Sequence, residues 1–300
     1  MFHLHIVFCQ IVNKKKYELC LEEYYQELFP YITMLDRNQR KRVRDMRRCL
    51  TIIAVMLGGF MESCSSPELA LKMQTTGLET NCYLLYDPVS REAAIIDVGG
   101  PIDELLTVIG EGNLHLEYFL LTHGHSDHLI GVPAVRGDFP DAQLCMHKDA
   151  YVDLQTEREW AMANLGEEVI AEWMQQYPYF HKIVEFDVDT LGDPDVFLDD
   201  GDVIHLGNHP IQVMLCPGHA RGSLCYHVDG LLFSGDVLFK GSVGRVDGQN
   251  SSRDDQITSV RRLYRELPDD TIVYPGHGES TTIGDERTGN KYITETAVDL

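Results

Sequence analysis

Seven consecutive residues, Thr122-His123-Gly124-His125-Ser126-Asp127-His128, carry the strongest signal in this chain. They bring three imidazoles and one carboxylate within six residues, directly behind the apolar run Tyr118–Leu121. Imidazole nitrogens and carboxylate oxygens at this density suit two adjacent divalent metal ions better than one. A structural zinc site would more often use cysteine pairs, and no Cys-x-x-Cys occurs anywhere in the sequence. The stretch therefore predicts a hydrolytic metal centre.

Three later segments repeat the same local pattern, an apolar strand that breaks at Gly or Pro into a loop with a metal-capable side chain. They are Val213–His219, Leu231–Asp236 and Ile272–His277. Rigid strands position ligands accurately, and the adjoining glycines allow tight turns. Taken alone, His219 or His277 would more often be a hydrogen-bonded surface imidazole. Four such loops in one chain instead favour a single shared site.

The composition describes a globular protein of 300 residues, enough for one or two domains. Its charge is uneven. Residues 1–50 carry ten Lys and Arg against six Asp and Glu, a net charge of +4, whereas residues 51–300 carry a net charge of −26, which gives the total of −22. An acidic body repels phosphate backbones, which argues against nucleic acid as a partner. Cys82, Cys145, Cys216 and Cys225 sit among apolar residues, as reduced core thiols do, with pairing left open.

The N-terminal seventy residues differ from the rest. Met46-Arg-Arg-Cys precedes an almost continuous apolar stretch from Leu50 to Met61, and Glu62-Ser-Cys64 follows. Arginines, a short apolar run and a small residue before a cysteine resemble a bacterial lipoprotein signal, although Glu62 departs from the lipobox. The run is short for a transmembrane helix.

We therefore expect residues 1–70 to be an extension, with a signal at 46–64, lipidation of Cys64 and a short tether to the domain at 71–300. Residues 1–45 are either a cytosolic extension or sequence upstream of a start at Met46. This predicts a protein of the cell envelope or periplasm, in contact with the membrane only through its anchor. The alternatives are an amphiphilic leader or weak membrane anchor, and a cytoplasmic protein.

Residues 71–300 alternate between strand-like and helix-like segments. The predicted strands are Cys82–Tyr86, Ala93–Asp97, Tyr118–Leu121, Ala142–Met146, Ile211–Cys216, Leu224–Val228, Leu231–Phe233 and Thr271–Tyr274. Helical spacing predicts helices over Leu129–Val135 and Asp255–Leu267. A helical insert is expected around 151–200, where Trp160, Leu165, Val169 and Trp173 fall near helical spacing. The insert either packs on the scaffold or forms a lid over the substrate pocket.

Together these residues resemble the metallo-β-lactamase-fold superfamily, whose signature is His-x-His-x-Asp-His followed by separate His, Asp and His ligands. The resemblance covers residues 72–290 and implies an α/β fold, a four-layered αββα sandwich with metals at the edge between its two sheets. It implies three ligand sets: His123, His125 and His219 for one ion, Asp127, His128 and His277 for a second, and Asp236 for both. Asp97 matches a buried acidic residue that steadies the metal-binding loops; its alternative is a strand-end cap.

Two such ions would lower the pKa of a shared water toward neutrality and create a hydroxide nucleophile. One ion can also polarise a carbonyl and stabilise its oxyanion. Asp127 is the candidate to orient the hydroxide, while Asp236 joins the two ions. Zinc is the expected metal, with Fe or Mn as alternatives.

Two stretches narrow the branch. Ser234–Asp247 resembles the glyoxalase II-like and persulfide-dioxygenase branches, and Thr281–Asn290 resembles the ending of short single-domain glyoxalase II-like hydrolases. Asp236 argues against the antibiotic-hydrolysing zinc enzymes, many of which have Cys there. The resemblance thus implies a metal-dependent hydrolase of hydroxyacylglutathione-like thioesters or related esters. The alternatives are a persulfide dioxygenase with a single iron, a lactonase or β-lactamase-like hydrolase, and a catalytically idle module.

The substrate-binding side is less defined. Only 23 residues follow His277, so the C-terminal helical domain of full-length glyoxalase II is not expected. Arg245 falls where that enzyme has a glutathione-contacting basic residue, and it either anchors a substrate carboxylate or pairs with Asp247 to hold the loop. The expected partner is a small-molecule substrate. The sequence makes no prediction of oligomeric state.

Overall fold

The structure, a computed structural model, describes residues 68–164, 166–176 and 180–300. The predicted signal segment at 46–64 and Cys64 therefore lie outside the described residues. Among the residues that are described, none of the helices combines the length and the apolar character that crossing a bilayer requires.

The first sheet begins with antiparallel strands and continues with parallel strands. Its six strands, in spatial order, are β1 (Ala70–Thr75), β2 (Asn81–Tyr86), β3 (Glu92–Ile96), β4 (His115–Leu120), β5 (Gln143–Met146) and β6 (Val196–Phe197). Pairing is antiparallel from β1 to β3 and parallel from β3 to β6. Parallel neighbours need crossovers, and α3 (Asp103–Gly112) and α4 (Val132–Arg136) lie in two of them.

The second sheet has the spatial order β14-β13-β10-β9-β8-β7. Its strands are β7 (Val203–Leu206), β8 (His209–Leu215), β9 (Leu224–Val228), β10 (Leu231–Gly235), β13 (Ile272–Pro275) and β14 (Thr281–Thr282). Only β10 and β13 pair in parallel, and the connection between them carries the hairpin β11 (Leu238–Phe239) with β12 (Ser242–Val243) and then α8 (Arg253–Glu266). Helix α9 (Ile283–Gly289) follows β14.

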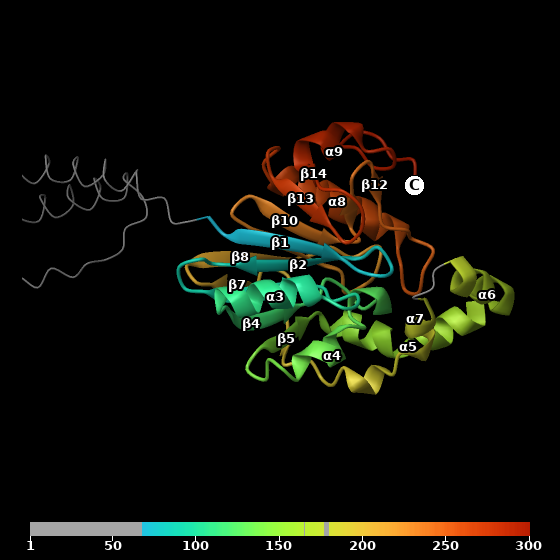
Figure 1. Cartoon of the computed structure of the whole chain (residues 1–300). Helices are drawn as coiled ribbons and strands as arrows, with labels where there is room; N and C mark the ends of the chain where they lie inside the picture. Colours follow the sequence, from blue (N-terminus) through green and yellow to red (C-terminus); the bar gives the residue numbers. More distant parts are fainter. Residues whose placement is uncertain (1–67, 165, 177–179) are drawn as a thin grey trace, which may run out of the picture. The chain divides into compact units, whose positions relative to one another are not determined.

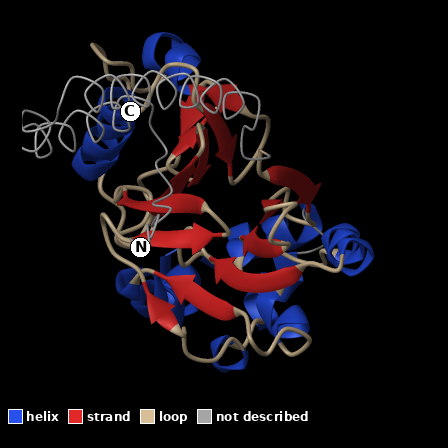
Figure 2. Ribbon diagram, turned by 90° about the vertical axis from the view of Figure 1, so that its left-hand side faces the viewer, coloured by secondary structure: helices blue, strands red, loops and turns tan. Residues whose placement is uncertain are grey.

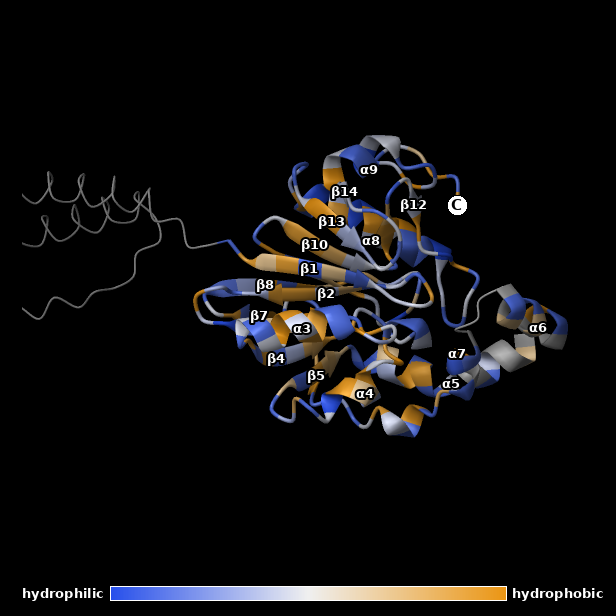
Figure 3. Ribbon diagram, viewed as in Figure 1, coloured by the Kyte–Doolittle hydropathy of each residue, from blue (hydrophilic) through white to orange (hydrophobic). Residues whose placement is uncertain are grey.

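Side-chain alternation along the strands creates three apolar layers between four layers of structure. In β2, Cys82 and Leu84 pack with α3 and α4, while Tyr83 and Leu85 pack with side chains of the second sheet. The other face of the second sheet packs on α8 and α9. Figure 1 shows α8 and α9 on one side of the strands and α3, α4 and α5 on the other. Figure 2 shows the strands in the middle, with the helices packed around them. Apolar residues colour β10 and β13 in Figure 3. The predicted αββα sandwich is confirmed.

The eight predicted strands are confirmed within about three residues at each end, which is the usual scatter of element boundaries. The helix predicted from Leu129 is wrong at its start, because Ser126–His128 first forms a 3₁₀ turn, η1. The Leu129 N–H donates to the Ser126 carbonyl (3.1 Å), and α4 begins only at Val132.

The segment around 151–200, where the sequence predicts a helical insert, carries three helices and a 3₁₀ turn. It contains α5 (Lys148–Asn164), α6 (Gly166–Gln176) and α7 (Phe180–Glu185), followed by the 3₁₀ turn η2 (Val188–Thr190). Trp160 lies in α5 and Trp173 in α6, so the predicted helical spacing spans two helices. The first turns of α5 pack on the first sheet, because Ala150 and Leu154 belong to the apolar layer beneath it.

Candidate metal centre

The metal-capable side chains stand on loops at one end of both sheets. In the second sheet β8, β10 and β13 run in the same direction, so their carboxyl ends lie at the same edge. His219, Asp236 and His277 follow these three strands. In the first sheet the segment from Thr122 follows β4, and the Leu224 N–H donates to the Thr122 carbonyl (2.7 Å), which joins the sheets at this edge. The topology brings ligands from both sheets to one place.

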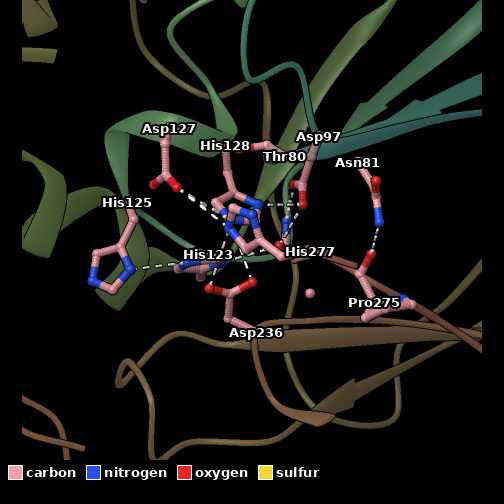
Figure 4. A network of polar contacts seen from close by, with 12 residues as sticks. Thr80, Asn81, Asp97, His123, His125, Asp127, His128, Asp236, Pro275 and His277 are labelled. Carbon is pink, nitrogen blue, oxygen red and sulfur yellow. Dashed lines mark hydrogen bonds and ion pairs between the residues drawn. The ribbon is translucent and has the colours of Figure 1, made fainter. Parts of the chain in front are cut away.

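Seven side chains converge there, and they are the seven that the sequence predicts as ligands. Their ligand atoms lie within 4.8 Å of one another in three overlapping groups: His123, His125 and His219; His123, His128 and Asp236; and Asp127, His128 and His277. Figure 4 shows the rings of His123, His128 and His277 gathered next to the Asp236 carboxylate. Because the groups share members, they form one cluster.

Asp236 lies at the centre of this cluster. Its Oδ2 is 3.5 Å from His219 Nε2 and 3.7 Å from His277 Nε2, and its Oδ1 is 3.4 Å from His128 Nε2. Oδ1 is buried and has no hydrogen-bond partner, a costly state for a carboxylate oxygen unless a cation binds it. A Cβ on Gly276 would lie 2.3 Å from this oxygen and 2.6 Å from His128 Cε1. Only glycine leaves room for both ligands.

The outward nitrogens of two rings are held by backbone carbonyls. His219 Nδ1 lies 2.9 Å from the Arg245 carbonyl oxygen, and His277 Nδ1 lies 3.0 Å from that of Glu79. A carbonyl only accepts hydrogen bonds, so each Nδ1 carries the hydrogen and donates it. In the neutral form of each ring, Nε2 then carries no hydrogen and is turned into the cluster, which is the tautomer that a metal ligand needs.

Asp97 orients two further rings. Its Oδ2 accepts from His128 Nδ1 (2.8 Å) and from the Thr122 hydroxyl (2.7 Å), and its Oδ1 accepts from the Thr122 N–H (2.8 Å). Because the Thr122 hydroxyl hydrogen points to Asp97, its oxygen accepts from His123 Nδ1 at 3.0 Å. One carboxylate thus turns Nε2 of both His128 and His123 inward. Asp97 reaches this position from a left-handed backbone conformation (φ 55°), which aspartate tolerates.

The inward nitrogens face one another at short distances. His128 Nε2 and His277 Nε2 are 3.2 Å apart, and His125 Nδ1 lies 3.0 Å from His123 Nε2 and 2.9 Å from His219 Nε2. With the outward nitrogens protonated, facing lone pairs repel unless a shared proton or a cation lies between them. Divalent metal ions with imidazole and carboxylate ligands fit this donor set.

Burial keeps the first group of rings neutral. Desolvation lowers the pKa of His219 to about 4 and also lowers the pKa of His123 and His125, with further lowering from neighbouring rings. At pH 7 these imidazoles therefore offer lone pairs, and a metal need not displace a proton from them.

The second group is dominated by carboxylates. Burial opposes a charge on His128, but the carboxylates of Asp236, Asp127 and Asp97 raise its pKa well above the usual value. Burial would likewise raise the pKa of Asp236, yet the neighbouring His128 lowers it well below its ordinary range, and His128 and His277 do the same for Asp127. Ionised carboxylates around a buried ring create a field that would attract a cation.

Two amide side chains support the ligand loops from behind, and no sequence pattern identifies either. The buried Gln256 accepts from the His219 N–H (2.8 Å) and donates to the Val237 carbonyl (2.7 Å), so it ties two ligand loops together. Asn81 donates to the carbonyls of Pro275 (3.1 Å) and Gly278 (2.9 Å), which flank His277. Figure 4 includes the first of the Asn81 contacts.

Arg245 lies beside the cluster rather than inside it. Its side chain is 53% exposed, and Nε pairs with Asp247 Oδ1 at 3.2 Å. Asp247 is the partner that the loop-holding alternative names. The backbone carbonyl of Arg245 accepts from His219, so the residue lies next to the first group of ligands. After burial and other charges, its positive charge contributes to the lowered pKa of His125.

Comparisons with known proteins agree with the fold. The sequence model of the Metallo-beta-lactamase superfamily matches residues 75–277. The hydroxyacylglutathione hydrolase GloC of Haemophilus influenzae is 31% identical over 226 residues, 73% of this chain and 94% of that protein. The solved structure of the BLEG-1 B3 metallo-beta-lactamase is 32% identical with a TM-score of 0.57 and covers 74% of this chain and 98% of that one. ETHE1 from Myxococcus xanthus is 25% identical with a TM-score of 0.58, over 76% and 86% of the two chains.

Proposed function

Since the chain belongs to the metallo-beta-lactamase superfamily, we propose that it is a binuclear metal-dependent hydrolase that cleaves a thioester or a related ester. The observation that carries the proposal is the single cluster of five imidazoles and two carboxylates, with Asp236 between its two halves. Members of this superfamily are generally metal-dependent hydrolases.

In the proposed centre, His123, His125 and His219 would hold one ion, Asp127, His128 and His277 would hold the other, and Asp236 would serve both. Such ions, when bound, would acidify a water toward neutral pH and act as a Lewis acid on a carbonyl. Neutral imidazoles with carboxylates suit zinc, and they also accept Fe or Mn.

Asp127 is the residue proposed to orient the attacking water. Its Oδ2 lies 3.4 Å from His277 Nε2, and the side chain is 25% exposed, so it faces both the cluster and the solvent-accessible side. The lowered pKa keeps its carboxylate ionised at neutral pH, which lets it accept a hydrogen bond from a water without taking up a proton from bulk solvent. Arg245, whose backbone carbonyl holds His219 and whose side chain is half exposed, is proposed to contact an anionic group of the substrate.

The choice of a thioester rests on the relative named a hydroxyacylglutathione hydrolase and on the Ser234–Asp247 stretch. A thiolate is a good leaving group and needs little help from a general acid. The same stretch also resembles the persulfide-dioxygenase branch, which makes a dioxygenase with one iron the second candidate. A lactonase or β-lactamase-like hydrolase is the third, and the likeness to a B3 metallo-beta-lactamase structure favours it.

The test combines metal analysis with three assays on the purified chain: hydrolysis of S-lactoylglutathione, hydrolysis of a β-lactam, and persulfide-dependent oxygen uptake. We expect two metal ions per chain and thioester hydrolysis that Asp236→Ala abolishes. Asp138→Ala, which removes an exposed carboxylate that is not part of the ligand cluster, is the control. One iron per chain with oxygen uptake and no hydrolysis would refute the hydrolase proposal.

The envelope location is also a proposal, made on residues 46–64 alone. It places the anchor on Cys64 and predicts incorporation of radiolabelled palmitate that Cys64→Ala abolishes. Equal labelling of both proteins, or none of either, would count against the anchor.

A further inference from the structure

The first turn of helix α5 lies against two of the ligand loops. A Cβ on Gly124, between His123 and His125, would come within 2.1 Å of the Ala150 carbonyl oxygen. A Cβ on Gly222, three residues after His219, would come within 2.3 Å of the Ala150 nitrogen. Both loops therefore touch the backbone of the same helical residue, and both can do so only through glycine.

One side chain of α5 binds the first loop directly. Glu157 Oε2 accepts from the Ser126 N–H (3.0 Å) and from the Ser126 hydroxyl. Ser126 lies between His125 and Asp127, which belong to different metal ions in the proposed centre. The carboxylate thus fixes the peptide that determines how far apart these two ligands lie.

A second side chain, one helical turn earlier, binds the other loops. Asp153 is 6% exposed and accepts from the Arg221 guanidinium, with Nε at 3.2 Å, and from Asn250 Nδ2 at 2.8 Å. Arg221 is two residues after His219, and Asn250 lies in the loop that follows Arg245. Residues four apart share one face of a helix, so Asp153 and Glu157 form a single acidic edge along α5.

This edge joins loops that come from different sheets. The Ser126 loop follows β4 of the first sheet, and the Arg221 loop connects β8 and β9 of the second. We propose that Asp153 and Glu157 are positioning residues of the metal centre, which hold the ligand loops of the two sheets at the separation that metal binding requires. The inference rests on the proposed binuclear centre and gives the helical insert a role in metal affinity.

The test is zinc affinity, measured by competition with a coloured chelator, together with the absorption spectrum of the cobalt-substituted protein. Glu157→Ala should raise the Kd for zinc about 10- to 100-fold, as loss of a group that orients ligands does, and should change the cobalt spectrum. Glu157→Gln should retain most of the affinity, because both Ser126 contacts use one oxygen, which the amide still offers. Glu159→Ala is the matched control, since Glu159 is an exposed glutamate on the same helix.

Wild-type zinc affinity and an unchanged cobalt spectrum in Glu157→Ala would overturn the inference. So would an equal loss in Glu157→Ala and Glu159→Ala. Should Glu157→Ala fail to fold, Asp153→Asn and Ser126→Ala provide the same readout through the other contacts, and unchanged affinity in both would overturn it as well. No substrate enters these measurements, so a wild-type chain that binds two metals but cleaves no thioester would refute only the proposed function.

Discussion

Replacement of Asp97 by asparagine tests the tautomer argument most directly. The Asp97 carboxylate accepts three hydrogen bonds, from the Thr122 N–H, the Thr122 hydroxyl and His128 Nδ1. An amide of the same shape has one oxygen and one NH₂ group. If its oxygen faces His128, the NH₂ group opposes the Thr122 N–H. If the NH₂ group faces His128, that ring is pushed to the tautomer with its hydrogen on Nε2, where a metal would bind.

Either orientation leaves at least one buried donor unsatisfied. The cost is about 1–3 kcal/mol, which corresponds to about 5- to 150-fold in a binding constant. This range agrees with the loss of about 10- to 100-fold in metal affinity that follows removal of a ligand's orienting partner. We therefore expect Asp97→Asn to raise the Kd for zinc by about one to two orders of magnitude while the chain stays folded.

The assay is the same chelator competition, with Asp87→Asn as the matched control. Asp87 is as deeply buried as Asp97 (both 2% exposed) and ends the neighbouring strand, but it accepts from the Val89 N–H away from the metal loops. We expect Asp87→Asn to bind zinc as the unchanged chain does. Wild-type affinity in Asp97→Asn would refute the tautomer reasoning, and an equal loss in both variants would show that the effect comes from the fold.

Three further predictions concern the same cluster. Gly276→Ala should lower kcat by about 100-fold, as displacement of a reacting group by about 1 Å does, because the added Cβ would clash with Asp236 and His128. Gly137→Ala is the control: its added Cβ has no neighbouring atom within 4 Å, so kcat should stay unchanged. Burial lowers the pKa of His219 from the ordinary 6.5 to about 4 in the folded chain. The metal-free protein should therefore lose up to about 3 kcal/mol of its free energy of unfolding as pH falls from 6.5 to 4. Urea unfolding should show a smaller loss in His219→Asn, and equal losses in the two proteins would contradict the assignment. When free zinc is kept at 100 times its Kd, its removal should lower the free energy of unfolding by about 3 kcal/mol and lower Tm. An unchanged Tm, with metal loss verified by elemental analysis, would exclude a metal contribution to stability.

The strands and the ligand loops could be predicted because their signals are local. The prediction of Leu224–Val228 is confirmed to the residue, since turn residues bound this apolar strand on both sides. The ligand loops share one local rule, an apolar strand followed by Gly or Pro and a metal-capable side chain. This rule identifies His219 and His277 without knowledge of what surrounds them.

The supporting contacts could not be predicted, because they join residues that are distant in sequence. Glu157 and Ser126 are 31 residues apart, and Asn81 and Pro275 are 194 apart. Neither pair follows a spacing that the sequence displays. Helix α3 could have been found, since Ile102, Leu105 and Ile109 fall on one face and are buried, a pattern that predicts an amphipathic helix.

The proposed metal ligands come from both sheets, and this has a consequence for how the protein would acquire its metals. His128 and His277 are 149 residues apart along the chain, yet their Nε2 atoms lie 3.2 Å from each other. Contacts of such high sequence separation form late in folding, because the entropy of closing a long loop must be overcome first. A complete set of ligands therefore exists only once both sheets have closed, and an early intermediate has no assembled site with which to select an ion. A metal bound in the proposed centre would then be drawn from the compartment in which folding ends, so its identity would record where in the cell that step takes place.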